Sequence, residues 1–231
     1  MLNSSSAEEP SQLLHPANCP AYIMAGGRSS RFGSDKARVE IASEPLLLAL
    51  RRCMSQAGHA VEIVADRADR YENIGLQCLV DQQSGQGPLA GVATALQHRE
   101  QQRPGWLLLV SCDLFVWKPE WFEKLAKKAM DLKQDSDGTL PQPACDSIAF
   151  VSDSKDSDTK DIEQGWEPFP SLLHTRLLLQ VLANLQRGQY SLQTLFRTSR
   201  AVGIESSDNP QAWTFNTPEQ LRALRPGVSS H

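Results

Sequence analysis

The sequence predicts an α/β fold, a three-layer sandwich with a mostly parallel, Rossmann-like sheet. Short apolar runs bounded by Gly, Asp or Pro alternate along the chain with longer stretches of helical spacing. Parallel strands joined through helices require right-handed crossovers, which place helices on both faces of the sheet. The 231 residues are enough for one ordinary domain with a full hydrophobic core.

Four short apolar runs are typical of buried strands. They are "AYIMA" at 21–25, "VEIVA" at 61–65, "LQCLV" at 76–80 and "WLLLVS" at 106–111. The segments between them have helical spacing and are predicted as helices at 46–57, 88–100 and 119–132. In the last of these, Trp121, Leu125 and Ala129 share one face and lysines lie opposite.

The pattern is looser after residue 132. "SIAFV" at 147–151 predicts another strand, and the acidic, Ser-rich segment near 152–165 predicts a solvated hairpin loop. That segment lacks the glycine and the carboxylate spacing of an EF-hand, so a calcium loop is not expected. The strongly apolar segment at 170–188 is predicted to become helical and to end at Gly188, and 218–225 is predicted as a short terminal helix.

Composition limits both the domain organisation and the partners. Residues 1–19 are polar and proline-containing, which predicts a disordered tail before a single domain at 20–231. With 27 acidic against 23 basic residues and a net charge of −4, the chain has no basic field for nucleic acid. A small anionic ligand can still bind at one basic loop.

Cysteine spacing and apolar run length favour a cytoplasmic protein that does not enter a membrane. The five cysteines form no C-x-x-C pair, so neither a zinc site nor a disulfide framework is indicated. Runs such as "LLLAL" and "WLLLV" are far shorter than the roughly 20 residues of a membrane span. The first ten residues carry acids and serines instead of a secretory signal.

The stretch "MAGGRSSRFGSDKA" at 24–37 follows the first predicted strand directly. Gly26 and Gly27 place a sharp turn at the carboxyl edge of the sheet, where open α/β sheets bind ligands. Successive backbone N–H groups of such a turn can bind an anion, and Arg31 and Lys36 add positive charge. The alternative is a plain glycine turn with exposed basic residues, which would not need this whole string.

Asp113 follows the strand predicted at 106–111 by two residues and so reaches the same edge as the glycine turn. A carboxylate there is a natural ligand for Mg²⁺, which takes one or two protein carboxylates and otherwise binds phosphate oxygens and water. The alternative is an aspartate that caps the next helix.

The glycine stretch resembles the nucleotide-binding signature of the molybdenum cofactor guanylyltransferases, L-A-G-G-x-S-x-R-M-G-x-D-K-A. Three further stretches are similar to that family in the same order: "DQQSGQGPLAGV" at 81–92, "VSCDLF" at 110–115 and "FNTPEQL" at 215–221. The segment at 167–196 is similar to one in which the family has a strand, a helix, a glycine turn and a second helix. The resemblance covers roughly residues 20–225 and makes 20–231 a nucleotidyltransferase domain.

The resemblance implies the transfer of GMP from GTP to the terminal phosphate of molybdopterin, with or without molybdenum, and release of pyrophosphate. The product would pass to cofactor-delivery proteins. A phosphate monoester has a second pKa of about 6, so the acceptor is mostly dianionic at neutral pH and needs no catalytic base. Charge neutralisation and alignment then carry the reaction.

The resemblance also implies roles for residues around the glycine turn. The backbone of Met24, Ala25 and Gly26 would line the nucleotide pocket, and Gly27 would let the triphosphate approach. Lys36 would neutralise the α- and β-phosphates, and Arg31 would stabilise the departing pyrophosphate. Asp113 would bind Mg²⁺, with Asn216 as candidate second metal ligand or acceptor contact.

The base and ribose would lie against a second set of residues. It comprises Asp81 and the Gly87, Leu89 and Gly91 positions of the "GPLAG" turn. Asp66 stands where the family usually has Asn, and its carboxylate can accept from the adjacent N1–H and N2–H₂ donors of guanine. Adenine and cytosine offer an acceptor beside a single donor and would be repelled.

One departure from the family pattern and two rival functions remain open. Leu114 and Phe115 stand where the family usually has Thr-Pro or a similar pair, which changes the turn after Asp113. One rival is a related nucleotidyltransferase that uses CTP, or a sugar phosphate as acceptor, whose relatives usually read L-A-A-G at the turn. The other is a GTP-binding relative without catalytic activity.

Overall fold

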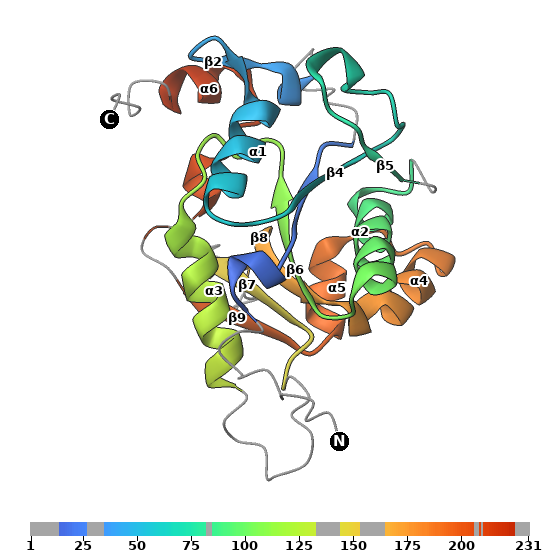
Figure 1. Cartoon of the computed structure of the whole chain (residues 1–231). Helices are drawn as coiled ribbons and strands as arrows, with labels where there is room; N and C mark the ends of the chain where they lie inside the picture. Colours follow the sequence, from blue (N-terminus) through green and yellow to red (C-terminus); the bar gives the residue numbers. More distant parts are fainter. Residues whose placement is uncertain are drawn as a thin grey trace, which may run out of the picture.

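The central sheet confirms the predicted α/β class. The computed structural model describes residues 14–26, 35–81, 85–132, 144–152, 165–205, 208 and 210–224. Their seven-stranded sheet has the order β5-β4-β1-β6-β8-β7-β9, with helices on both faces (Figure 1). Its strands are β1 (Ala21–Met24), β4 (Val61–Ala65), β5 (Leu79–Val80), β6 (Trp106–Ser111), β7 (Ser147–Ser152), β8 (Gly165–His174) and β9 (Ala201–Glu205).

Strand direction places the ends of β1, β4, β5 and β6 at one edge of the sheet. β1 pairs in parallel with β4 and β6, and β4 pairs in parallel with β5. In register, Met24 lies beside Val64 on one side and Ser111 on the other. β8 runs antiparallel to β6 and β7. A separate hairpin of β2 (Glu40–Ile41) and β3 (Glu44–Pro45) precedes the first helix.

Two apolar clusters on opposite faces of the sheet hold the three layers together. One cluster takes side chains from α1 (Leu46–Gln56), α3 (Pro119–Asp131) and α6 (Pro218–Leu224), and the other from α2 (Pro88–Gln102), α4 (Leu178–Gln186) and α5 (Leu192–Thr198). Alternation along β1 assigns each residue to a face: Ile23 joins the first cluster and Tyr22 the second.

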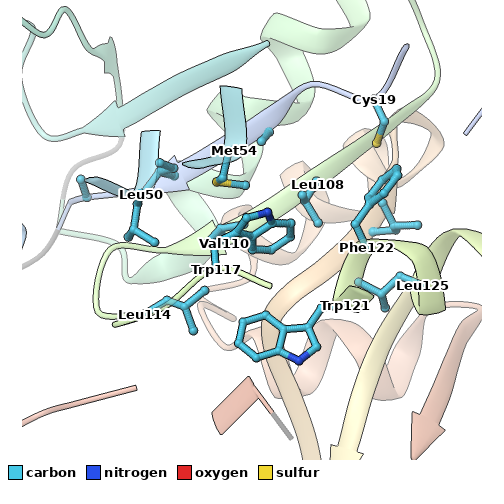
Figure 2. Packing of buried hydrophobic residues seen from close by; sticks show 14 of the residues in the cluster. Cys19, Leu50, Met54, Leu108, Val110, Leu114, Trp117, Trp121, Phe122 and Leu125 are labelled. Atoms are coloured by element: carbon cyan, nitrogen blue, oxygen red, sulfur yellow. The ribbon is translucent and has the colours of Figure 1, made fainter. Parts of the chain in front are cut away.

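Figure 2 shows the first cluster, in which aromatic side chains before and within α3 pack against β6. Trp121 is fully buried, and its ring meets that of Trp117 edge to face at 6.0 Å. Leu108 and Val110 of β6 contact the same cluster. The strand that ends just before Asp113 is therefore rigidly packed on this face, which fixes the position of its end.

The predicted elements around the site are confirmed to within two residues, whereas two others need correction. β1, β4 and β6 and helices α1, α2 and α3 occupy their predicted positions. The helix predicted over 170–188 is wrong for its first residues, because β8 runs to His174 and α4 begins only at Leu178. A fully buried strand reads as a continuous apolar run and cannot be told from a buried helix by periodicity. Of 76–80, only Leu79 and Val80 form a strand.

The expected tail boundary at residue 19 also needs correction. Leu14 is 4 % exposed and Cys19 is fully buried, and a short 3₁₀ helix (Pro16–Asn18) lies between them. These apolar side chains contribute to the first cluster, so residues 14–19 belong to the domain. Residues 1–13 of the expected tail lie outside the described part of the chain.

The expected acidic hairpin loop connects β7 to β8, which pair antiparallel as a hairpin requires. Residues 153–164 of that loop lie outside the described residues. Within the described ranges the longest helix, α2, has 15 residues, and none of the helices there could cross a bilayer.

Candidate active site

The turn after β1 is tied to both neighbouring strands. The Ala25 amide donates to the Val64 carbonyl at 2.8 Å, and the Cys112 amide donates to the Met24 carbonyl at 3.1 Å. The Tyr71 hydroxyl lies 3.0 Å from the Ala25 carbonyl oxygen. The start of the predicted anion-binding turn is therefore held between the ends of β4 and β6. Gly27 and Arg31, two of the predicted site residues, lie outside the described part of the chain.

A cavity of about 740 Å³ opens beside this turn. It is within the size range of small-molecule sites. Its lining brings together six of the predicted residues with four others: Met24, Gly26, Val64, Ala65, Asp66, Asp81, Gly85, Gly87, Pro88 and Gly91. Ala25 and Leu89 are not part of the lining, and Leu89 is fully buried in the second apolar cluster. Leu89 can therefore face a ligand only through its backbone.

Gly87 and Gly91 shape the wall that α2 contributes. Gly87 precedes the helix with φ +72° and ψ −171°, a conformation that essentially only glycine adopts, and Pro88 is the first helical residue. A Cβ at Gly91 would lie 2.3 Å from the Met24 Cε, so the end of the Met24 side chain packs directly against the helix backbone at Gly91. The amino-terminal end of α2, with its partial positive charge, thus faces the cavity.

Asp66 reaches the cavity from the end of β4 and is bound by Arg70. Its Oδ1 lies 2.6 Å from the Arg70 Nη1. Burial raises the pKa of the Asp66 carboxyl, but the hydrogen bond and positive charge of Arg70 outweigh it and leave the pKa below its usual range. Asp66 is therefore an ionised acceptor at the cavity wall.

Asp35 fixes the short segment that carries Lys36. Its Oδ1 accepts from the Ala37 amide at 3.1 Å and so caps the 3₁₀ helix Lys36–Arg38. Its Oδ2 accepts from the Arg70 Nε and Nη2 at 3.2 and 3.1 Å. The capped turn fixes the backbone from which the Lys36 side chain extends.

Lys36 joins two distant parts of the sequence. Its Nζ donates to the Asn216 Oδ1 at 2.7 Å and to the Phe215 carbonyl at 3.1 Å, and lies 3.7 Å from the Asp113 Oδ2. The Lys36 side chain is only 12 % exposed and that of Asp113 22 %. Three of the predicted residues therefore meet at the sheet edge next to the cavity, although they do not line it. One is a cation, and the other two carry side-chain oxygens.

The loop after β6 holds Asp113 and Asn216 side by side. The Phe215 amide donates to the Asp113 carbonyl at 3.2 Å, and the Phe115 amide donates to the Trp213 carbonyl at 2.7 Å. Leu114 and Phe115 are 1 % and 6 % exposed. The departure from the family pattern at these positions therefore changes the core beneath Asp113 and Asn216. It adds no exposed side chain beside these two residues.

A capping box starts α6 directly after Asn216. The Thr217 Oγ1 accepts from the Gln220 amide at 3.3 Å, and the Gln220 Oε1 accepts from the amides of Thr217 and Asn216 at 3.2 and 2.6 Å. This reciprocal arrangement fixes the Asn216 backbone and leaves its side-chain oxygen directed at Lys36.

The oxygen donors at this edge suit a hard cation. Asp113 offers a carboxylate and Asn216 an amide oxygen, the ligand types that Mg²⁺ prefers. No group of three or more His, Cys, Asp or Glu side chains within the described ranges could form a closed metal cage. An open site of one carboxylate and one amide matches an ion that also binds phosphate oxygens and water.

Comparison with known proteins identifies the family. Residues 21–202 match the family model described as the MobA-like NTP transferase domain. The chain belongs to this family. A MobA-like NTP transferase is a nucleotidyltransferase enzyme, and the glycine turn and Asp113 both lie within the matched residues.

Curated relatives of this MobA-like chain agree with that assignment. It is 28 % identical over 211 residues to the "Probable molybdenum cofactor guanylyltransferase" of Nostoc sp., covering 90 % of this chain and 91 % of the relative. It is 28 % identical over 203 residues to the molybdenum cofactor guanylyltransferase of Photobacterium profundum, covering 87 % and 92 %.

The fold is shared with molybdopterin-guanine dinucleotide biosynthesis protein A from Archaeoglobus fulgidus. That structure has a TM-score of 0.68 and 17 % identity, covering 90 % of this chain and 97 % of that one. The bifunctional IspDF from Campylobacter jejuni has a TM-score of 0.62 and 14 % identity, covering 88 % of this chain and 53 % of that one.

The sequence did not predict the residues that connect the cavity of this MobA-like site, at Asp66, with the segment that carries Lys36. Arg70 and Tyr71 were not predicted to take part, and Asp35 was noted only as part of the glycine string. The signals available were the spacing of four between Asp66 and Arg70 and the position of Asp35 next to Lys36. Neither signal predicts that a single arginine contacts both carboxylates.

Proposed function

We propose that this chain transfers GMP from GTP to the terminal phosphate of molybdopterin and releases pyrophosphate. The observation that carries the proposal is the meeting of Lys36, Asp113 and Asn216 at the sheet edge, beside a cavity bordered by the glycine turn. The relatives named as molybdenum cofactor guanylyltransferases, matched over about nine-tenths of the chain, support it.

The cavity takes the guanine base and ribose. Asp66 and Asp81 are its acidic lining residues, and the amino-terminal end of α2 borders it at Gly87 and Pro88. Guanine presents the N1–H and N2–H₂ donors side by side, and the ionised Asp66 carboxylate can accept from both. Adenine and cytosine place an acceptor beside a single donor, so they would leave part of this carboxylate unpaired and bind more weakly.

The triphosphate lies across the glycine turn toward Lys36. The ammonium of Lys36 neutralises the α- and β-phosphates, and Arg31 stabilises the departing pyrophosphate. Asp113 and Asn216 would hold Mg²⁺, which would neutralise the charge that develops on the phosphate oxygens. The acceptor phosphate needs no catalytic base because it is mostly dianionic at neutral pH.

The acceptor is molybdopterin in its metal-free or molybdenum-bearing form, and the rim formed by Asp113 and Asn216 is where its phosphate approaches. We place the reaction in the cytoplasm, with the product passed to cofactor-delivery proteins and with neither nucleic acid nor membrane as a partner. The net charge of −4 supports the exclusion of nucleic acid.

The test is guanylylation of molybdopterin by the purified protein. GTP, Mg²⁺ and molybdopterin are supplied, and the dinucleotide is detected by mass spectrometry while pyrophosphate release is followed. CTP, ATP and UTP serve as matched controls. Preferred turnover of CTP would favour the related nucleotidyltransferase. GTP binding in calorimetry without pyrophosphate release would instead indicate a non-catalytic relative.

A further inference from the structure

Arg70 lies between two carboxylates at the edge of the site. Its Nη1 donates to the Asp66 Oδ1 at 2.6 Å, and its Nε and Nη2 donate to the Asp35 Oδ2 at 3.2 and 3.1 Å. The Arg70 side chain is only 15 % exposed. A guanidinium is a rigid, planar fork, so contacts from its different nitrogens fix both acceptors relative to each other.

The two carboxylates serve different parts of the site. Asp66 lines the cavity beside the glycine turn. Asp35 caps the 3₁₀ helix whose first residue is Lys36, the cation next to Asp113. Arg70 is therefore the link between the wall that faces the base and the turn that carries the phosphate-binding lysine.

Tyr71 makes this link rigid. Its hydroxyl lies 3.0 Å from the Ala25 carbonyl oxygen and 3.1 Å from the Asp35 Oδ2, and its side chain is fully buried. The guanidinium carbons of Arg70 and Arg38 lie 5.6 and 5.3 Å from the centre of the Tyr71 ring. Ala25, Asp35 and Arg70 are thus all in contact with the Tyr71 side chain.

We infer that Arg70 is a positioning residue for nucleotide recognition, which orients Asp66 toward the base and, through Asp35, holds the turn that carries Lys36. The inference rests on the proposed use of GTP. Arg70 occupies one acceptor position on the Asp66 Oδ1, and a carboxylate has about four, so the donors of guanine still find acceptors. Without Arg70, the Asp66 side chain, which is 40 % exposed, would turn freely into water.

The experiment compares GTP with ITP, whose base keeps N1–H but lacks the N2 amino group. Dissociation constants are measured by calorimetry in Mg²⁺ for the wild type, Arg70→Gln and Arg52→Gln. Arg52, on α1, is the matched control because it makes the same kind of forked contact with Glu44 on β3. Its Nε and Nη2 donate to the Glu44 Oε1 and Oε2 at 3.3 and 2.8 Å. Losing one donor to a charged acceptor should make the wild type prefer GTP by about tenfold or more.

Arg70→Gln should lower that GTP-to-ITP preference to about threefold or less, because Asp66 is no longer held toward the base. It should also weaken ITP binding itself by about tenfold, because Asp35 no longer holds the segment that carries Lys36 in place. Arg52→Gln should keep both wild-type values. Asp35→Asn should weaken the binding of both GTP and ITP, because Asp35 caps the 3₁₀ helix that begins at Lys36. In an Asp66→Ala background, adding Arg70→Gln should leave the preference unchanged, because Arg70 acts on the base through Asp66.

Wild-type preference and affinity in a folded Arg70→Gln variant would overturn the inference, and so would an equal loss of preference in the Asp66→Ala background. If circular dichroism shows that Arg70→Gln does not fold, Arg70→Lys decides. It keeps the charge but lacks the planar fork that fixes the two carboxylates relative to each other, so the preference must still fall, and an unchanged preference overturns the inference. Failure of the wild type to bind GTP, or equal binding of ATP, would instead contradict the proposed function.

Discussion

Gly87→Ala tests whether the cavity wall depends on a conformation that only glycine adopts. The backbone at Gly87 has φ +72° and ψ −171°, a region that costs other residues about 1–3 kcal/mol. An added Cβ would lie 3.0 Å from the Tyr190 Cβ and 3.3 Å from its carbonyl oxygen, atoms close to the backbone that cannot swing away. Crowding of this kind costs about 1–3 kcal/mol more, so we expect a total loss of about 2–6 kcal/mol in the free energy of unfolding.

Thermal unfolding followed by circular dichroism measures this loss. For a domain of this size about 1 kcal/mol shifts Tm by roughly 2–4 °C, so Gly87→Ala should lower Tm by roughly 4–24 °C. Gly75→Ala is the matched control, because Gly75 also has a positive φ of +75° but has nothing within 4 Å of an added Cβ. Its loss should be about 1–2 kcal/mol, the cost of the left-handed conformation alone.

Calorimetry with GTP then separates stability from function. Because Gly87 lines the cavity and Gly75 does not, only Gly87→Ala should weaken nucleotide binding at a temperature where both variants are folded. Equal Tm losses in the two variants would refute the steric argument about Tyr190. A Gly87→Ala variant with wild-type Tm and wild-type affinity would refute the whole derivation.

Three further predictions concern the metal ligand, the lysine and a buried histidine. Asp113→Asn should reduce Mg²⁺-dependent turnover by about 100-fold or more with unchanged thermal unfolding, and a wild-type rate would exclude the metal assignment. Lys36→Ala should weaken GTP binding and lower kcat/KM by about 10- to 100-fold, whereas an unchanged kcat/KM would argue against a phosphate contact. Burial lowers the pKa of His59 below the ordinary 6.5, so the folded chain binds this proton less readily than the unfolded chain. Its contribution to stability is complete above about pH 6.5 and is lost as pH falls toward the folded pKa, so urea midpoints should drop more between about pH 7.5 and 5.5 in the wild type than in His59→Gln, and equal drops would contradict this.

The strands that position the site could be predicted because local sequence decides them. β1, β4 and β6 are short apolar runs with glycine, aspartate or proline beside them. Runs of this length are typical of buried strands and are too short for an ordinary helix. β8 could not be separated from α4 in the same way, because both are apolar and join at His174–Leu178 without a glycine or proline. There the resemblance to the family, which implied a strand before the helix, predicted more than periodicity did.

The same contrast applies to the site. The glycine turn and Asp113 each follow a strand immediately, so the shared edge of a parallel sheet predicts that they are neighbours. The contact between Lys36 and Asn216 joins residues 180 positions apart. The resemblance to the family assigned both residues to the site but did not predict that they contact each other. The Arg70 contacts depend on the path of the loop after β4, which neither spacing nor motif determines.

The contacts of Lys36 and Arg70, two of the basic residues at the site, indicate different roles. Lys36 is bound mainly by uncharged oxygens, at 2.7 and 3.1 Å, and its carboxylate neighbour Asp113 is 3.7 Å away, beyond hydrogen-bond length. Exchanging neutral acceptors for phosphate oxygens strengthens the hydrogen bonds of an ammonium, so Lys36 can turn to an anion at little cost. Arg70 is held by two carboxylates at 2.6 to 3.2 Å and would lose charge-assisted hydrogen bonds if it turned away. The first cation is therefore free to serve the substrate, whereas the second fixes the shape into which the substrate binds.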